Sequence, residues 1–241
     1  MKRVGILGGM GPEATVLLMQ KLLRAVDAID DADHIPLLVD QNPQVPSRIR
    51  YLIEGTGKDP GPTLAAMAAN LERAGALAIA MPCNTGHHFV PEIRAAISVP
   101  FLDMVQLSTT RALQSGGPVG ILASPAVRKV GLFDRALQGQ GGHALYPDDQ
   151  DALLSAIRSL KSTGPNPAAL ATLKAASAEL QKKGSAVQMI ACTEFSLLAS
   201  ELPQAFDTLD VLVKAITDFA TKPTQPKAAA ARPTEETPGH A

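Results

Sequence analysis

Two cysteines are the residues whose type and setting suit chemistry, and the sequence contains no others. Each follows a short apolar run that predicts a buried strand, residues 76–80 before Cys83 and residues 186–190 before Cys192. In a parallel α/β sheet, reactive groups and ligands meet beyond the carboxyl ends of the strands. A thiolate can remove a proton and a thiol can return one, so two thiols facing one ligand can act as base and acid.

Other roles for the cysteines fit the sequence less well. Their long separation excludes a Cys-Xaa-Xaa-Cys redox pair, and a structural disulfide is the weaker interpretation for a protein of the reducing cytosol. A metal site built from both cysteines with His87 and His88 lacks the paired ligand spacing of such sites, so we predict no metal. A Cys–His nucleophile stays open but leaves the second thiol without a role.

Small polar residues directly follow each cysteine. They are Asn84 and Thr85 in the first loop, and Thr193 and Glu194 in the second. Their side chains and backbone amides can hold a substrate carboxylate and the negative charge that develops when a proton leaves. We expect each thiol to lie at a helix N-terminus, where the pKa of a cysteine falls.

Composition narrows the classes of partner and location. The chain has 241 residues and 46% hydrophobic content, enough for a large core. A net charge of −1, an aromatic fraction of 3% and the absence of Trp argue against a nucleic-acid partner. No apolar run is long enough for a signal sequence or a membrane helix, so we predict a soluble cytoplasmic protein with no membrane partner.

The first half of the chain alternates predicted strands and helices. Residues 4–7 predict a buried strand, followed by a glycine turn that includes Met10 and Gly11 and by a helix starting at Pro12. Free N–H groups in such a turn can hold an anion. Further strands are predicted at residues 35–40 and 99–103, with a helix at 62–74, and Arg48 lies in the loop after the second strand.

The second half of the chain repeats the first. Val119-Gly120-Ile121-Leu122-Ala123 matches the first strand, the Cys192 loop matches the Cys83 loop, and the segment ending at Asp210 matches the segment ending at Asp103. The matches occur in the same order at similar intervals. We therefore predict two similar α/β units whose cysteine ends face one cleft, with boundaries at 1–105 plus a C-terminal helix 210–221, and at 106–209. Residues 222–241 are rich in Pro and Ala and predict a disordered tail.

Three motifs together resemble the aspartate/glutamate racemase family, within the Asp/Glu/hydantoin racemase superfamily. They are Gly8-Gly9-Met10-Gly11-Pro12 with Thr15, Met81-Pro82-Cys83-Asn84-Thr85 with His87, and Ala191-Cys192-Thr193-Glu194. The resemblance implies two pseudo-symmetric three-layer α/β lobes, each with a short parallel sheet. It also implies a cleft between the lobes, two catalytic cysteines, no pyridoxal phosphate or other cofactor, and a homodimer.

The resemblance also implies a set of substrate-binding residues. Arg48, which follows Asn42 and Pro46, matches an arginine of the aspartate branch, and Lys161 matches a lysine of that branch. Both are expected to contact substrate carboxylates, for which a bidentate arginine is well suited. The sequence departs from the family in the turn after residue 123, where Ser124 keeps a hydroxyl but Val127 replaces a second one. The expected contacts with the substrate are Met10, Gly11, Asn42, Arg48, Asn84, Thr85, Ser124, Lys161, Thr193 and Glu194.

These features predict an isomerase that racemises an acidic amino acid, aspartate first and glutamate second, with two thiols as base and acid. Related activities stay open on the same scaffold, namely hydantoin racemisation, maleate cis-trans isomerisation and decarboxylation of a substituted malonate. The last typically uses one cysteine, which the presence of two argues against. A non-catalytic module that binds a small anion is the alternative outside catalysis.

Overall fold

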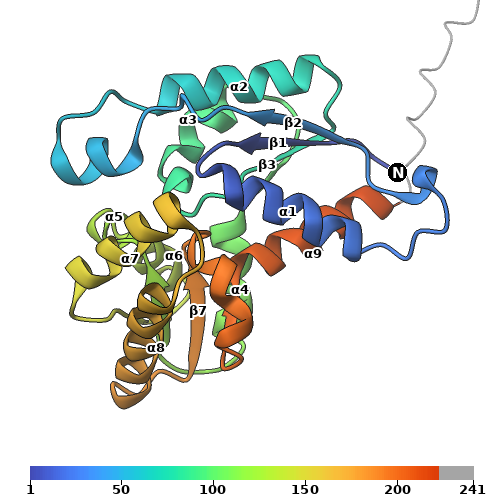
Figure 1. The fold of residues 1–241 in the computed structure, drawn as a ribbon. Coiled ribbons are helices and arrows are strands. Elements are labelled where there is room, and N and C mark those ends of the chain that lie inside the picture. Colours follow the sequence, from blue (N-terminus) through green and yellow to red (C-terminus); the bar gives the residue numbers. More distant parts are fainter. Residues whose placement is uncertain (223–241) are drawn as a thin grey trace, which may run out of the picture.

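Two four-stranded parallel sheets form the frame of the protein in a computed structural model that describes residues 1–222 (Figure 1). The C-terminal segment predicted to be disordered lies, from residue 223 on, outside the described residues. The first sheet has the order β2-β1-β3-β4 and the second β6-β5-β7-β8, so the two sheets share one topology. This confirms the predicted fold class of two similar α/β lobes, each with a short parallel sheet.

The strands of the first sheet are β1 (Val4–Gly8), β2 (Leu37–Gln41), β3 (Ala78–Ala80) and β4 (Phe101–Leu102). Those of the second sheet are β5 (Val119–Ala123), β6 (Ala144–Leu145), β7 (Val187–Ala191) and β8 (Ala205–Asp207). Strands β1 and β5 are buried along their whole length, because helices cover both faces of each sheet. Both the second and the fourth strand start later than predicted, after Pro36 and Pro100, since proline has no N–H for the ladder.

The helices of the first half are α1 (Pro12–Arg24), η1 (Asp31–Asp33), η2 (Arg50–Glu54), α2 (Gly61–Arg73), η3 (Thr85–Phe89), α3 (Val90–Ala95) and α4 (Met104–Leu113). Those of the second half are α5 (Pro125–Lys129), α6 (Leu132–Gln138), α7 (Gln150–Thr163), α8 (Pro167–Lys182), η4 (Phe195–Glu201) and α9 (Thr208–Thr221). The segments η1, η3 and η4 are 3₁₀-helices and η2 is one turn of π-helix. Helix α1 starts at Pro12 as predicted, because proline is preorganised for the first helical position.

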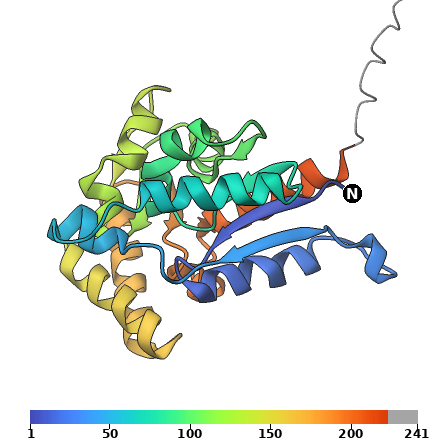
Figure 2. The same cartoon turned by 90° about the horizontal axis from the view of Figure 1, so that it is seen from above.

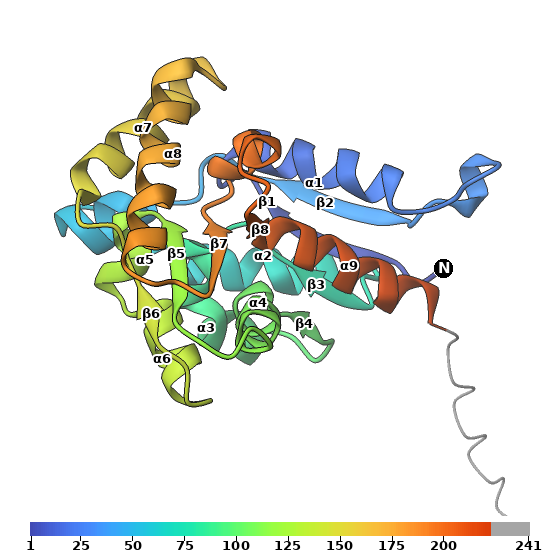
Figure 3. The same cartoon turned by 90° about the horizontal axis from the view of Figure 1, so that it is seen from below.

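Each lobe receives a helix from the other half of the chain. Helix α9 follows the last strand of the second sheet but packs against the first sheet, where Leu212 and Ile216 join Val4 and Ile6 in one buried cluster (Figure 3). Helix α4 follows the first sheet but places Val105 in the core of the second lobe. The chain therefore crosses twice between the lobes, and the residue boundaries that we assign to them stay a prediction.

The remaining helices complete three layers in each lobe. Helices α2 and α3 cover the face of the first sheet opposite α1 and α9, and Figure 2 shows α2 and α1 on either side of the strands. In the second lobe, α7 and α8 cover one face and α4, α5 and α6 the other. The segment around η2 reaches from the first lobe to α5 and α7 of the second, which closes one side of the region between the sheets.

The exchanged helices are capped by equivalent carboxylates. Asp103 accepts hydrogen bonds from the first turn of α4, and Asp207 accepts one from Leu209 in the first turn of α9. The sequence repeat had matched Asp103 with Asp210 instead. The structure corrects this match, because Asp210 lies inside α9 and Asp207 is the residue that ends the strand and starts the helix.

Candidate active site

Both cysteines lie on the wall of one cavity of about 310 Å³ between the two lobes. Cys83 follows β3 and Cys192 follows β7, and these two strands hold the same place in their sheets. Both residues are buried as free thiols. The full lining is Met10, Ser47, Arg48, Ile49, Arg50, Glu54, Cys83, Thr85, Ser124, Leu154, Ile157, Arg158, Lys161, Cys192 and Glu194. The topology thus brings together two residues that are far apart in the sequence.

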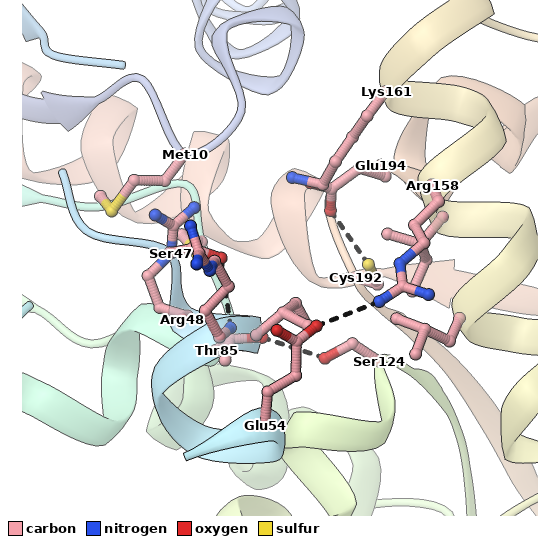
Figure 4. Close-up of a pocket in the computed structure, with 15 residues that line it drawn as sticks. Met10, Ser47, Arg48, Glu54, Thr85, Ser124, Arg158, Lys161, Cys192 and Glu194 are labelled. Atoms are coloured by element: carbon pink, nitrogen blue, oxygen red, sulfur yellow. Dashed lines mark hydrogen bonds and ion pairs between the residues drawn. The ribbon is translucent and has the colours of Figure 1, made fainter. Parts of the chain in front are cut away.

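The two sulfur atoms make hydrogen bonds of opposite kinds. The backbone N–H of Gly86 donates to Sγ of Cys83 over 3.4 Å. Sγ of Cys192 lies 3.0 Å from Oε2 of Glu194 and donates to it (Figure 4). A carboxylate is an acceptor only, so this contact requires a protonated Cys192 thiol.

Burial and the charge of Glu194 raise the pKa of Cys192 well above its usual value. This corrects the expectation that both thiols have a lowered pKa at a helix N-terminus. Each cysteine is followed by a short 3₁₀-helix rather than a long α-helix, and the carboxylate beside Cys192 opposes ionisation of its thiol. Cys192 is therefore arranged as a proton donor.

Lys161 of α7 balances the charge of Glu194. Its Nζ atom lies 2.5 Å from Oε1 of Glu194, on the other side of the carboxylate from the thiol. Burial alone would raise the pKa of Glu194, but the charge and hydrogen bond of Lys161, together with the hydrogen bond from Cys192, outweigh burial and the pKa is lowered. Burial alone would lower the pKa of Lys161, but the charge and hydrogen bond of Glu194, together with the two cysteines, outweigh burial and the pKa is raised. Thiol, carboxylate and ammonium form one connected group on the second-lobe side of the cavity.

His87 fixes the first cysteine loop rather than facing the cavity. Its Nδ1 atom donates to the carbonyl oxygen of Cys83 over 2.8 Å, and its Nε2 accepts from the backbone N–H of Met104 over 3.1 Å. This pattern requires the neutral ring, and burial lowers the pKa of His87 accordingly. His87 therefore ties the backbone at Cys83 to the start of α4.

Arg48 reaches the cavity from the long loop after β2. Its Nη1 atom donates to the carbonyl oxygens of Val45 and Pro46, which holds the guanidinium in place. In Figure 4, Arg48 lies on the opposite side of the cavity from Lys161. Two cations predicted from the sequence thus border the same space from different lobes.

Two contacts bridge the lobes around the cavity. Oγ1 of Thr85 and Oγ of Ser124 lie 3.0 Å apart and form a hydrogen bond between the lobes. At the mouth, Nη2 of Arg158 lies 3.2 Å from Oε1 of Glu54 (Figure 4). Both partners of this ion pair are exposed, so it stabilises the fold by only about 0–1 kcal/mol.

Several residues predicted to bind substrate do not line the cavity. The side chain of Asn42 accepts from Gln44 and contacts Met67, and the side chain of Asn84 donates to Thr208. Thr193 is buried, but it is not among the residues that line the cavity.

Gly11 is not among the lining residues either, but it lies next to the cavity wall. A Cβ atom built on Gly11 would be 3.9 Å from both Lys161 and Glu194.

The glycine turn is less open to an anion than predicted. The N–H of Gly9 donates to Oγ1 of Thr15 over 3.0 Å, so one of its donors is already used. Gly9 has a φ of +90°, and a Cβ atom there would meet the backbone of Asn42 at 2.4 Å. Only glycine fits this close approach, which brings Met10 to the wall of the cavity.

The cavity includes residues that sequence reasoning missed. Arg158 and Leu154 lie on the same helix as Lys161, at the spacing of one helical face. Once Lys161 is predicted to face the substrate, this spacing indicates that Leu154 and Arg158 face it as well. Arg50 and Glu54 offered none, because the sequence does not predict the π-helical turn that carries them.

A family model described as Asp/Glu/Hydantoin racemase matches residues 7–216. The chain belongs to this family. The resemblance inferred from the three motifs is confirmed, and membership makes the protein a racemase-type isomerase by class. Among residues 1–222, no group of three or more His, Cys, Asp or Glu side chains is placed to hold a metal ion.

Individual relatives agree with the family. The aspartate racemase of Picrophilus torridus superimposes with a TM-score of 0.82 at 28% identity, covering 93% of this chain and 96% of its own. The broad specificity amino-acid racemase RacX of Bacillus subtilis is 26% identical over 172 residues, covering 66% of this chain and 70% of RacX. Glutamate racemase RacE1 of Bacillus anthracis shares the fold, with a TM-score of 0.61 at 15% identity over 91% of this chain and 80% of its own.

Within the part of the chain that the structure describes, no helix is both long enough and apolar enough to cross a membrane. The cytoplasmic location and the homodimer stay predictions.

Proposed function

We propose that this family member racemises an acidic amino acid, aspartate first and glutamate second, without a cofactor. Cys83 and Cys192 would be the two acid–base groups. One observation carries the proposal: both thiols border one cavity from the ends of equivalent strands, β3 and β7. The similarity to the Picrophilus torridus aspartate racemase supports the choice of substrate.

The opposite hydrogen bonds of the two sulfurs suggest how the reaction starts. As a thiolate, Cys83 would take the proton from the α-carbon, and the electron pair of the broken C–H bond would be delocalised into the α-carboxylate. Cys192, which donates to Glu194, would then pass its thiol proton to the opposite face of the carbon. The centre is inverted, Cys83 ends as a thiol and Cys192 as a thiolate, and the reverse reaction uses the same groups in exchanged roles.

Charge in the cavity supports an acidic substrate. Within residues 1–222, both hydrogen bonds of the Arg48 guanidinium use Nη1, which leaves Nε and Nη2 for a substrate carboxylate. Lys161 is paired with Glu194, so a second carboxylate would share this cation with Glu194. Desolvating a carboxylate requires such partners, because an unpaired charge in a buried site is costly.

A second candidate is racemisation of neutral amino acids. Met10, Leu154 and Ile157 give part of the cavity wall an apolar character, and Glu194 already neutralises Lys161. The similarity to a racemase named for its broad specificity fits this alternative. The two candidates share the two-thiol chemistry and differ only in the side chain that the cavity accepts.

A chiral assay tests both candidates. The purified protein, with no cofactor added, is incubated with a panel of L-amino acids, and the D-enantiomers are separated by chiral chromatography. D-aspartate or D-glutamate as the fastest product supports the proposal, and a faster neutral amino acid favours the second candidate. No D-enantiomer from any acidic amino acid would overturn the proposed substrate, and hydantoins and maleate then test the related activities.

A further inference from the structure

A chain of buried hydrogen bonds connects the two cysteine loops through a residue that does not line the cavity. Nδ2 of Asn84, next to Cys83, donates to Oγ1 of Thr208 over 3.0 Å. Oγ1 of Thr208 donates to the carbonyl oxygen of Ile190 over 2.9 Å. Ile190 lies in β7, two residues before Cys192. Asn84 is 2% exposed and the other two are fully buried, so water does not compete for these bonds.

The direction of each bond in this chain is fixed by chemistry. A carbonyl oxygen only accepts, so the single hydroxyl proton of Thr208 must point to Ile190. The lone pairs of Oγ1 then require a donor, and the amide nitrogen of Asn84 supplies it. Replacing the hydroxyl with a methyl group would leave the buried amide of Asn84 and the carbonyl of Ile190 without these partners.

Thr208 occupies the point where the chain crosses between the lobes. It is the first residue of α9, the helix that leaves the second sheet and packs on the first. Met104 holds the same place at the start of α4 and has no hydroxyl. Within the described residues, the Asn84–Thr208–Ile190 link thus belongs to one of the two crossings only.

We propose that Thr208 is a positioning residue that sets the separation of the two sulfur atoms across the cavity. This inference rests on the two-thiol function proposed above, since two bases must reach opposite faces of one carbon. A misplacement of about 1 Å can cost roughly 100-fold in rate. The link joins the residue after Cys83 to the strand that ends at Cys192, so it acts on the distance that matters.

Three variants separate positioning from general stability. Thr208→Val removes the hydroxyl at nearly constant volume, and Thr208→Ser keeps it. Thr217→Val is the matched control, because Thr217 lies on the same helix and its hydroxyl donates to the carbonyl of Val213 within that helix. We expect kcat to fall about tenfold or more in Thr208→Val with little change in KM, near wild-type kcat in Thr208→Ser, and no change in Thr217→Val. Thr208→Ala replaces Thr208→Val if the latter does not fold.

Deuterium exchange gives a readout that a merely structural role would not move. In D₂O, a displaced acid slows delivery to the far face, while the base still removes the α-proton, exchanges it with solvent and returns a deuteron on its own face. Thr208→Val should therefore raise the ratio of α-deuterium in the starting enantiomer to product formed. A loss of activity with an unchanged ratio would overturn the proposal, since loss of folded protein lowers both processes equally.

A chemical measurement tests the link without relying on activity. Bifunctional methanethiosulfonates of graded spacer length cross-link Cys83 to Cys192, and mass spectrometry gives the yield for each spacer. The spacer profile of Thr208→Val should broaden or shift, and that of Thr208→Ser should match the wild type. An identical profile in all variants would overturn the proposal. A Thr208-dependent profile in a protein that racemises no acidic amino acid would uphold the link and reject the proposed substrate.

Discussion

Sγ of Cys192 donates a hydrogen bond over 3.0 Å to Oε2 of Glu194, which lies two positions later in the sequence. The residue two positions after Cys83 is Thr85, which instead bonds to Ser124 of the other lobe. The repeat therefore gives both thiols the same place in their sheets, but these two neighbours give them different surroundings. This asymmetry supports the proposed role of Cys192 as the acid, and several consequences can be measured.

Replacing either cysteine with serine should abolish racemisation of aspartate, because a serine hydroxyl is a far weaker acid than a thiol. Cys83→Ser keeps Cys192 and Cys192→Ser keeps Cys83, and each remaining thiol can act as a base once it is ionised. In D₂O, one variant should exchange the α-proton of the L-enantiomer and the other that of the D-enantiomer, each with retention of configuration. NMR of the α-proton measures exchange, and chiral chromatography measures inversion.

The double serine variant is the control for that experiment and should show neither exchange nor inversion. Near wild-type racemisation by Cys192→Ser would contradict the two-thiol pairing. The acid on that face would then have to be Glu194 or a bound water.

Neutralising Glu194 should make Cys192 ionise more readily. Burial and the Glu194 carboxylate both raise the pKa of Cys192, so Glu194→Gln removes one of the two causes and leaves Lys161 as the nearest charge. The pKa should fall, and alkylation of Cys192 at neutral pH should become faster, since the thiolate is the reactive form. The measurement is the pH profile of iodoacetamide labelling, with Cys83→Ser in the background.

Glu201→Gln is the matched control for this change. Glu201 ends the 3₁₀-helix that starts directly after Glu194, but it is exposed and pairs with Lys174. Its loss should leave the labelling profile of Cys192 in place. A Cys192 profile that does not move in Glu194→Gln would mean that burial alone sets the pKa.

Much of the fold could be predicted because its signals are local. The apolar runs at residues 4–7 and 119–123 are buried strands, and the repeat of motifs reflects a repeat of topology. The sequence could not give the pairing of Asn84 with Thr208, since nothing local links residues so far apart. The expected contact of Asn84 with the substrate stays a prediction, and the type of a residue does not reveal that its amide nitrogen also meets Thr208.

The pKa of the second thiol was the main error in predicting the site. An expected position at a helix N-terminus suggested a stabilised thiolate, but the pKa of Cys192 depends on burial and on the rotamer of Glu194. Arg158 was missed for a related reason. Its place on the cavity wall follows from how α7 packs, which brings Lys161 and Arg158 to one side of the space between the lobes.

Arg48→Lys should weaken binding of an acidic substrate more than it slows the chemistry. Lysine keeps the charge but loses the planar fork that meets a carboxylate with two bonds. Loss of a hydrogen bond to a charged group costs about 1.5–3 kcal/mol, so KM should rise roughly 10- to 100-fold with a smaller change in kcat. Steady-state kinetics with aspartate check this. Arg73→Lys on the exposed side of α2 is the control, and an unchanged KM in Arg48→Lys would remove Arg48 from the substrate site.

The Asp207 carboxylate should make the stability of the fold depend on pH. It is 3% exposed, caps α9 through Leu209 and accepts a hydrogen bond from Ser196 over 2.8 Å. Burial outweighs these bonds and the attraction of Lys21, and raises the pKa of Asp207 from 3.8 to about 6. The unfolded chain therefore releases this proton at lower pH than the folded protein does. The contribution of Asp207 to stability is largest below pH 3.8 and falls as the pH rises to about 6.

Asp207→Asn should remove this dependence, because the amide oxygen can still accept from Ser196 and Leu209 but carries no charge. The free energy of unfolding of the variant minus that of the wild type should increase between pH 4 and pH 7, by on the order of 3 kcal/mol. Urea denaturation at several pH values measures it. Asp218→Asn is the control, since Asp218 lies exposed on the same helix and pairs with Lys214, and it shows the general effect of removing one carboxylate from α9. A flat or falling difference for Asp207→Asn would show that the folded protein holds Asp207 ionised at no cost.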